Sequence, residues 1–181
     1  MHYWTVVFGD IPEELQPTVE WNQRKFGLEV VRLDPIVGAE GVDLVETITI
    51  ASDTYRWRRL ASQADGADEI YVDPDCVLLK PLDDIEPEAL PYWPLDNPAA
   101  TPQPDAFVTR VSRELAQAVL DAGEKTCGLN QYCWPRKVLR DWPGIKQIDP
   151  SYYEHLMYST NKRRQLQRAA KTAAKHPNRE E

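Results

Sequence analysis

The sequence predicts an α/β fold in which a mainly parallel sheet is flanked by helices in one small domain. Apolar segments typical of strands alternate with segments that have helical spacing, and this alternation favours parallel strands joined by helical crossovers. The chain has 181 residues, enough to bury a core of its own. Its 42% apolar and 28% charged residues are usual for a globular domain.

The first strand, helix and second strand are expected within the first 33 residues. Residues 3–9 (YWTVVFG) are apolar and rich in β-forming side chains, which predicts a buried strand ending at Gly9. A helix is expected next, with Pro12 in its first turn and Gly27 closing it. Residues 28–33 (LEVVRL) alternate between apolar and polar side chains and predict the second strand.

The middle of the chain predicts one helix, one strand and a long loop. Residues 52–63 are expected to be helical, with Ser52 or Asp53 as the cap that accepts bonds from the N–H groups of the first turn. Residues 69–73 (EIYVD) predict the third strand. Proline and aspartate are dense in residues 83–105, which are therefore expected to form a loop.

The last part of the chain predicts a fourth strand and further helices. Residues 112–123 are expected to form a capped helix that ends at Gly123, and residues 131–142 a helix broken at Pro135. The remaining expectations are a strand at 106–111, irregular structure at 143–160 and a terminal helix at 161–175.

Charge divides the chain into a body, residues 1–160, and a basic tail, residues 161–181. The chain has a net charge of −8, yet the tail holds seven basic and two acidic side chains, which leaves −13 on the body. One interpretation of the tail is a solvated, alanine-rich helix that frays at its end. The other is an electrostatic arm for a polyanion, a membrane surface or nucleic acid.

The cysteines and the hydropathy predict a cytoplasmic protein. The three cysteines, Cys76, Cys127 and Cys133, lack the spacing of a metal site, and their odd number favours reduced thiols. No window of about 18 apolar residues predicts a transmembrane helix. The N-terminus lacks the pattern of a signal peptide.

Two aspartates, Asp73 and Asp75, follow the third expected strand in the segment 71–82 (YVDPDCVLLKPL). Ligands bind outside the carboxyl ends of strands in open α/β sheets, and residues two apart in extended backbone point to the same side. Neighbouring carboxylates raise each other's pKa, but a divalent cation between them and a polyphosphate makes the pair favourable, and such oxygen ligands suit Mg²⁺ or Mn²⁺. The alternative is a plain turn, because Asp-Pro-Asp is a common turn sequence.

Residues 51–82 resemble the small-sugar-transferring glycosyltransferases of the GT-A fold that have a DXD sugar-binding region. This family includes bacterial capsular sugar transferases, yeast-type mannosyltransferases and clostridial glucosylating toxins. Its pattern is Ala/Ser-Asp-x-x-Arg at a helix start, a Gly-Gly turn, then Tyr-Leu-Asp-x-Asp and residues like LLKPL. The chain departs from it at residues 66–69, where Gly-Ala-Asp-Glu replaces Gly-Gly, and a weaker likeness covers residues 3–160. The matching residues are Asp53, Arg56, Tyr71, Asp73, Asp75, Leu79, Lys80, Pro81 and Leu82.

The resemblance implies a metal-dependent retaining glycosyltransferase whose catalytic domain is residues 1–160. The implied donor is a nucleotide sugar, with a UDP-sugar favoured, and the implied cofactor is Mn²⁺ or Mg²⁺. The resemblance also implies that Asp75 binds the metal directly and that Asp73 holds the ribose or the water shell of the metal. Arg56 would contact the donor sugar together with Asp53 and could pair with phosphate oxygens. The implied catalytic residues are Asp53, Arg56 and Asp75. The implied donor-binding residues are Asp53, Arg56, Tyr71, Asp73, Asp75, Phe8 and Gly9.

The family usually closes its metal site with a residue near the C-terminus. The segment YYEHLMYSTNKRR offers His155 and Ser159, with Glu154 as a rival, and the plain alternative for His155 is a partly buried histidine. Trp4 is offset by three residues from the position of the family's base-stacking tryptophan, so base stacking and core packing are both open roles for it. The candidates for contacts with the acceptor are Asn130, Gln131 and Trp134.

The acceptor and the class of function stay open at this point. A hydroxymethylated base in phage-type DNA would suit the basic tail, and a bacterial surface glycan or small glycoside is the alternative acceptor. A catalytically silent module that binds nucleotide sugar or metal is a second class, and a Mg²⁺ phosphotransferase is a third, although no Walker glycine loop is present. A basic face for DNA would draw on Arg56, Arg58, Arg59, Arg110, Arg136, Lys137 and Arg140.

Overall fold

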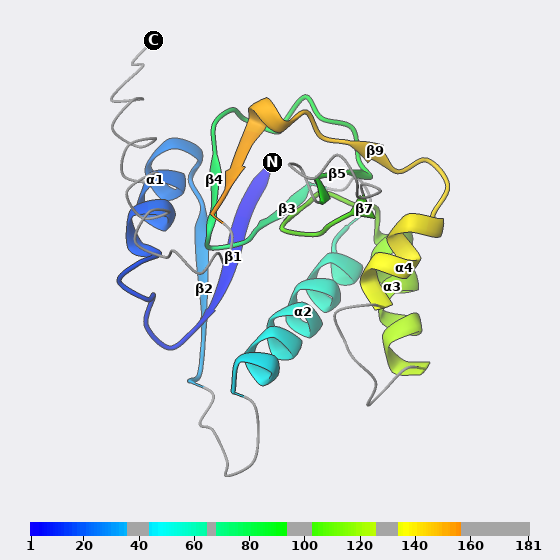
Figure 1. Cartoon of the computed structure of the whole chain (residues 1–181), viewed down its shortest axis with the longest axis horizontal. Helices are drawn as coiled ribbons and strands as arrows, with labels where there is room; N and C mark the ends of the chain where they lie inside the picture. Colours follow the sequence, from blue (N-terminus) through cyan, green and yellow to red (C-terminus); the bar gives the residue numbers. More distant parts are fainter. Residues whose placement is uncertain (36–43, 65–67, 94–102, 126–133, 157–181) are drawn as a thin grey trace.

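A four-stranded sheet forms the centre of the computed structural model, which describes residues 1–35, 44–64, 68–93, 103–125 and 134–156 (Figure 1). The strand order is β2-β1-β3-β8, with β1 parallel to both of its neighbours and β8 antiparallel to β3. The predicted mainly parallel α/β fold is therefore confirmed. The strands of this sheet are β1 (His2–Phe8), β2 (Glu29–Leu33), β3 (Glu69–Val72) and β8 (Val108–Thr109).

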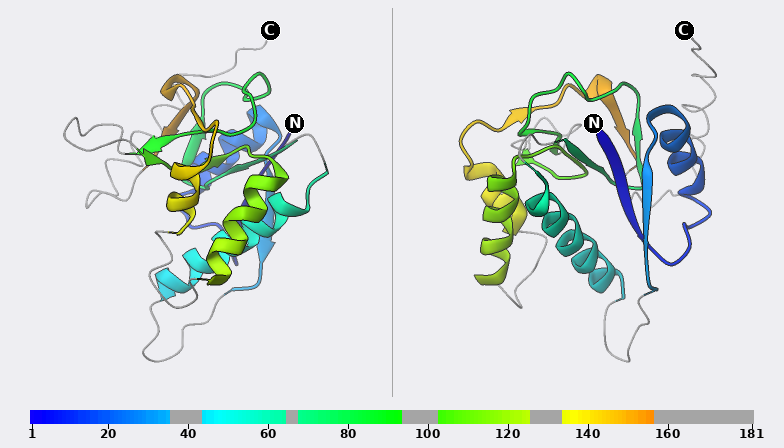
Figure 2. Two further views of the ribbon diagram at one scale, coloured as in Figure 1. Left: turned by 90° about the vertical axis from the view of Figure 1, so that its right-hand side faces the viewer. Right: turned by 180° about the vertical axis from the view of Figure 1, so that it is seen from behind.

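Helices cover both faces of this sheet. One face carries α1, and the other carries α2 with α3 and α4 beyond it, as the front and back views show (Figures 1 and 2). Among the described residues, no helix has both the length and the apolar character needed to cross a membrane. The helices are α1 (Gln16–Phe26), α2 (Leu44–Ser62), α3 (Arg113–Lys125) and α4 (Trp134–Asp141).

The two central strands, β1 and β3, are apolar at nearly every position because both of their faces are covered. Tyr3 packs in a core cluster with Val19 of α1, whereas Trp4 and Val6 pack in a second cluster with Trp57 of α2. Successive side chains of a strand point to opposite faces, so a strand covered on both faces must be apolar at nearly every position. The same alternation continues in β3.

The first helix begins later than the sequence predicts. Pro12 precedes α1 in a turn where its carbonyl accepts the N–H of Leu15 at 2.8 Å, and the proline in the first turn of α1 is Pro17. A proline suits this position because it has no N–H to satisfy. The predicted end is confirmed, because Gly27 caps the helix in the left-handed conformation at φ 67°.

The predicted cap of the second helix is wrong. Helix α2 begins at Leu44, so Ser52 and Asp53 lie inside it and do not cap it. The segment before Ser52 is rich in the β-branched residues threonine and isoleucine, which have weak helix propensity, and tertiary packing overrides such a preference. As a consequence, Asp53 projects from a formed helix and can pair with Arg56 one turn later.

Two proline and glycine predictions in the later helices also need correction. Ser112 caps α3 as predicted, since its Oγ accepts the N–H of Leu115 at 3.2 Å, but the helix continues past Gly123 to Lys125. Pro135 does not break a helix: it is the second residue of α4, where its missing N–H costs nothing.

Short strands occupy the segments predicted to be irregular. Within the described parts of 83–105 and 143–160, the chain forms strands of two or three residues that pair with one another or with β4. Such short elements carry almost no periodicity, which is why the sequence did not reveal them. Here β5 (Ala89–Leu90) pairs with β9 (Lys146–Gln147), β6 (Tyr92–Trp93) with β7 (Gln103–Pro104), and β4 (Cys76–Leu78) with β10 (Tyr153–His155), which follows the 3₁₀ turn η1 (Pro150–Tyr152).

Strand β4 is held between β10 and helix α1. On the helix side, the buried Asn22 amide donates to the Cys76 carbonyl at 2.8 Å and accepts the Leu78 N–H at 3.0 Å. The Trp21 indole donates to the Leu78 carbonyl at 2.8 Å. Side chains of α1 thus complete the hydrogen bonds of a strand edge that would otherwise be unpaired. The turn that precedes β4 is fixed as a result.

The tail lies outside the described residues. The predicted boundary at residue 160, the terminal helix at 161–175 and the basic tail at 161–181 all fall within residues 157–181, which the structure does not describe. The domain division therefore stays a prediction.

Candidate functional site

Asp73 and Asp75 lie on a tight turn between β3 and β4. The Cys76 N–H donates to the Asp73 carbonyl at 2.9 Å and closes the turn, and the Asp73 N–H donates to the Phe107 carbonyl at 2.7 Å. The expectation that extended backbone would align the two carboxylates is therefore wrong, and the turn alternative describes the backbone correctly. The turn nevertheless brings both carboxylates to the carboxyl edge of the sheet.

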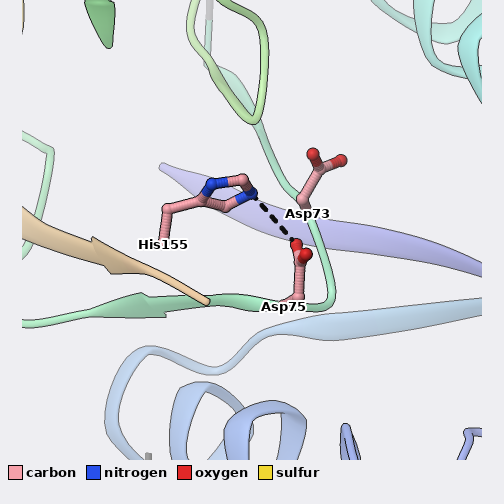
Figure 3. Close-up of side chains that lie close together, drawn as sticks. All are labelled: Asp73, Asp75 and His155. Carbon is pink, nitrogen blue, oxygen red and sulfur yellow. Dashed lines mark ion pairs between the residues drawn. The ribbon is translucent and has the colours of Figure 1, made fainter. Parts of the chain in front are cut away.

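His155 joins the two aspartates from β10 (Figure 3). Its Nε2 lies 3.3 Å from Asp75 Oδ1, and one ligand atom each of Asp73, Asp75 and His155 lie within 4.8 Å of one another. The His155 and Asp75 side chains are each 17% exposed, so the group is accessible but largely shielded. Glu154, the rival, occupies the neighbouring strand position, where side chains point to the opposite face.

The electrostatics of this group favour a cation. Burial is the main cause that raises the pKa of Asp73 to about 7, and although the Arg56 charge lowers that pKa, the Asp75 charge raises it again. Burial by itself lowers the pKa of His155, but the hydrogen bond and charge of Asp75 outweigh burial and raise it. The aspartates thus favour a positive charge at the position of His155.

Arg56 organises the aspartates from inside the protein. Only 5% of it is exposed, Nη2 donates to Asp53 Oδ1 at 2.5 Å, and Nη1 donates to the Ala106 carbonyl at 2.8 Å. Nη1 also lies 3.7 Å from Asp73 Oδ1, and the guanidinium carbon is 4.8 Å from the centre of the Tyr71 ring. Both Nη atoms thus have protein partners, which favours support of Asp53 and Asp73 over direct pairing with phosphate.

The residues expected at the end of the first strand lie at the same edge of the sheet. Strand β1 ends at Phe8, and Gly9 follows with φ 71°, where a Cβ would come within 3.2 Å of Pro35. Trp4 is fully buried, and its ring packs edge-on to Tyr71 with 5.0 Å between centroids. Burial excludes base stacking by Trp4 in this structure, so its role is core packing.

Several predicted site residues are not placed. Ser159, Asn130 and Gln131 lie outside the described residues, and for Trp134 the structure describes only that it begins α4. The suggested basic face is wrong in part, because the buried side chains of Arg56 and Arg110 cannot contribute to a surface.

Three neighbouring residues of the site escaped the sequence reasoning. Ala106 and Phe107 supply the carbonyls that hold Arg56 and Asp73, and the charge of Asp105 raises the pKa of both Arg56 and His155. These residues precede β8, which runs antiparallel, so its amino end rather than its carboxyl end meets the site. The rule that ligands bind at the carboxyl ends of strands therefore does not identify residues 105–107.

Comparison with known proteins identifies the fold. No protein-family model and no curated protein sequence matches the chain. A glycosyltransferase involved in the glycosylation of the major capsid of PBCV-1 aligns at a TM-score of 0.54 and 13% identity, over 93% of this chain and 99% of that one. The apo-form glycosyltransferase GlyE of Streptococcus pneumoniae TIGR4 covers 82% of this chain and 37% of its own at a TM-score of 0.43 and 13% identity, which carries no conclusion.

The first of these likenesses establishes that the chain has the fold of a glycosyltransferase over nearly its whole length. The fold that the resemblance implied is therefore confirmed. At this identity the likeness concerns the fold, and function has to be argued from the site.

Proposed function

We propose that the chain is a metal-dependent retaining glycosyltransferase that moves a sugar from a nucleotide sugar to a hydroxyl acceptor. The observation that carries this proposal is the convergence of Asp73, Asp75 and His155, with ligand atoms within 4.8 Å of one another. It is supported by the Asp53–Arg56 pair beside them and by the fold shared with a glycosyltransferase.

The three side chains fit a divalent cation. Oxygen ligands lie about 2.0–2.6 Å from Mg²⁺ or Ca²⁺, so ligand atoms within 4.8 Å of one another can share one ion of this size. Carboxylates suit Mg²⁺ and Mn²⁺, and the neighbouring carboxylates of Asp73 and Asp75 favour either ion between them. Asp73, Asp75 and His155 would hold the ion, which would neutralise the charge that develops on the departing nucleoside diphosphate. Ser159 stays a proposed further ligand.

The other side chains bind and orient the donor sugar. Arg56 holds the Asp53 carboxylate in place through a short bond, and it balances part of the Asp73 charge. Carboxylate oxygens accept hydrogen bonds, so Asp53 and Asp73 would take the hydroxyl groups of the donor. Tyr71, under the Arg56 guanidinium, donates to Asp73 and fixes its orientation. Phe8 and Gly9 would border the donor from the end of β1.

The proposed reaction needs no dedicated general base. The bond between the anomeric carbon and the diphosphate oxygen breaks, and a bond from that carbon to the acceptor oxygen forms on the same face of the sugar. The acceptor proton passes to the leaving diphosphate, which leaves as a nucleoside diphosphate. The resemblance favours UDP as the nucleotide, and a UDP-sugar is therefore the first donor to test.

Two acceptor classes follow from different observations. The resemblance to bacterial capsular sugar transferases favours a bacterial surface glycan or small glycoside as the acceptor. The seven basic side chains of residues 161–181 favour the phosphate backbone of DNA and hence a hydroxymethylated base. Asn130, Gln131 and Trp134 are the proposed acceptor contacts in either case.

A panel of nucleotide sugars tests the proposal. The protein is incubated with each donor and Mn²⁺, with and without a glycoside or hydroxymethylated DNA, and free UDP or GDP is measured. We expect release from one donor, its loss in Asp75→Asn and its retention in the exposed control Asp84→Asn. Donor binding with metal but no transfer to any acceptor would instead indicate a catalytically silent module. Absence of both metal and donor binding would refute the proposal.

A further inference from the structure

The ring of Phe107 lies flat against the imidazole of His155. The two ring centres are 4.2 Å apart and the planes are inclined by 11°, and Tyr153 packs edge-on against Phe107 at 5.2 Å. Phe107 is 3% exposed, so its ring is itself held by the core. One face of the imidazole therefore rests on a rigid surface, while Asp75 contacts its Nε2 at 3.3 Å.

The main chain of the same residue supports the other side of the site. The Phe107 carbonyl accepts the Asp73 N–H at 2.7 Å. The preceding carbonyl, that of Ala106, accepts Arg56 Nη1 at 2.8 Å and Thr109 Oγ1 at 2.6 Å. Residues 106 and 107 thus contact Asp73, Arg56 and His155, which come from three separate elements.

We propose that Phe107 is a positioning residue of the site, whose ring holds His155 in the orientation that completes a metal site with Asp73 and Asp75. This inference rests on the proposed function, because the metal site is part of that proposal. His155 belongs to the small β4–β10 sheet and Asp73 to the end of β3, so the orientation of one relative to the other depends on contacts between the two sheets. The stack of Phe107 on His155 is such a contact.

The first test replaces the ring and measures the Mn²⁺ affinity by electron paramagnetic resonance. Phe107→Leu removes the stack but leaves the carbonyl that holds Asp73, and we expect Mn²⁺ binding to weaken about tenfold, since partners that orient a metal ligand typically contribute 10–100-fold. Phe107→Tyr keeps the ring and is expected to retain the affinity. Phe26→Leu is the matched control, because Phe26 packs against the same core cluster with its ring 6.0 Å from Tyr3.

A double-mutant cycle asks whether Phe107 acts through His155. If it does, Phe107→Leu weakens Mn²⁺ binding in the wild-type background and has no further effect in a His155→Ala background. An equal loss in both backgrounds would overturn the proposal, as would an unchanged affinity in Phe107→Leu. Thermal unfolding monitors each variant, and Phe107→Met replaces Phe107→Leu if the leucine variant does not fold.

A measurement on the metal-free protein separates this inference from the proposed function. The three-bond coupling constants of the His155 side chain report whether it occupies one rotamer. We expect a single rotamer in the wild type and averaging in Phe107→Leu, and a single rotamer in both would overturn the positioning role even where metal binds. Absence of Mn²⁺ binding in the wild type, with averaging in Phe107→Leu, would refute the metal site but retain the effect of Phe107 on His155.

Discussion

The two ends of the central sheet carry the same kinds of side chain in different arrangements. At the amino edge, Arg59 contacts Glu29 and Glu69, each at 2.9 Å, and His2 lies between the same two carboxylates at 3.2 and 3.0 Å. Every carboxylate of this amino-edge cluster has a cationic partner. Its four side chains are partly exposed to solvent, with Arg59 packed over the Trp4 ring at 4.2 Å.

At the carboxyl edge, several carboxylates lie around one buried arginine and one histidine. Asp53 and Asp73 share the buried Arg56, and Asp75 has His155. The charge of Asp105 also acts on Arg56 and His155. The comparison agrees with the proposed metal site: arginine and histidine side chains contact both carboxylates of the amino-edge cluster, whereas a bound divalent cation would balance the carboxylates at the carboxyl edge.

Replacing one carboxylate at each edge should give the largest difference in activity between the two edges. We expect Asp75→Asn to lower metal-dependent release of the nucleoside diphosphate by about a hundredfold or more, since a metal contributes several kcal/mol to stabilising developing charge. Glu69→Gln at the amino edge should change that rate less than about twofold, because surface charges far from a site act weakly. Equal effects in steady-state assays of both variants would remove the distinction between the edges.

The two arginines should differ in what they contribute to stability. Arg56→Ala leaves Asp53 and Asp73 without their buried partner, and we expect a loss of about 3–5 kcal/mol in the free energy of unfolding. Arg59→Ala breaks partly exposed pairs, for which about 1 kcal/mol is expected. Denaturant unfolding of both variants measures the difference. Similar losses would show that burial does not distinguish the two guanidinium groups.

Removal of charge at Asp73 should stabilise the metal-free protein. The pKa of Asp73 is raised from 3.8 to about 7 in the folded state, so folding binds a proton between these values and stability falls as the pH rises through that window. We expect Asp73→Asn to add on the order of 1 kcal/mol above pH 7 and almost nothing near pH 4. Glu69→Gln should have the opposite sign, because it breaks the pair with Arg59. Unfolding in chelator at both pH values measures this, and a destabilised Asp73→Asn at pH 8 would contradict it.

The pH dependence of metal binding is the smallest effect expected. Metal ligands must be deprotonated, and the pKa values of Asp73 and His155 are both raised. Mn²⁺ affinity should therefore weaken severalfold as the pH falls from 8 to 6. The upper limit is about a tenfold loss of affinity per pH unit for each proton that a ligand takes up. Titrations at both pH values measure it, and a constant affinity would show that neither side chain takes up a proton when the metal leaves.

Local patterns in the sequence were sufficient for the main elements and half of the site. Strands β1 and β3 were predictable because helices cover both of their faces, which demands unbroken apolar runs. Gly27 was predictable as a helix end because its backbone adopts a positive φ. Asp73 and Asp75 were identified because their spacing directly follows a buried strand, and Asp53 and Arg56 because they match a family pattern.

Only the tertiary structure decided which distant groups complete the site. The pairing of β10 with β4 turns His155 rather than Glu154 toward the aspartates, although the two are adjacent in sequence. The antiparallel entry of β8 brings Phe107 against His155, and α2 begins early enough to place Asp53 within a helix. The physical reason is sequence separation. A periodic pattern reflects the neighbours of a residue along the chain, whereas these contacts join segments about 20 to 80 residues apart. The short strands in these segments leave no periodic pattern of their own.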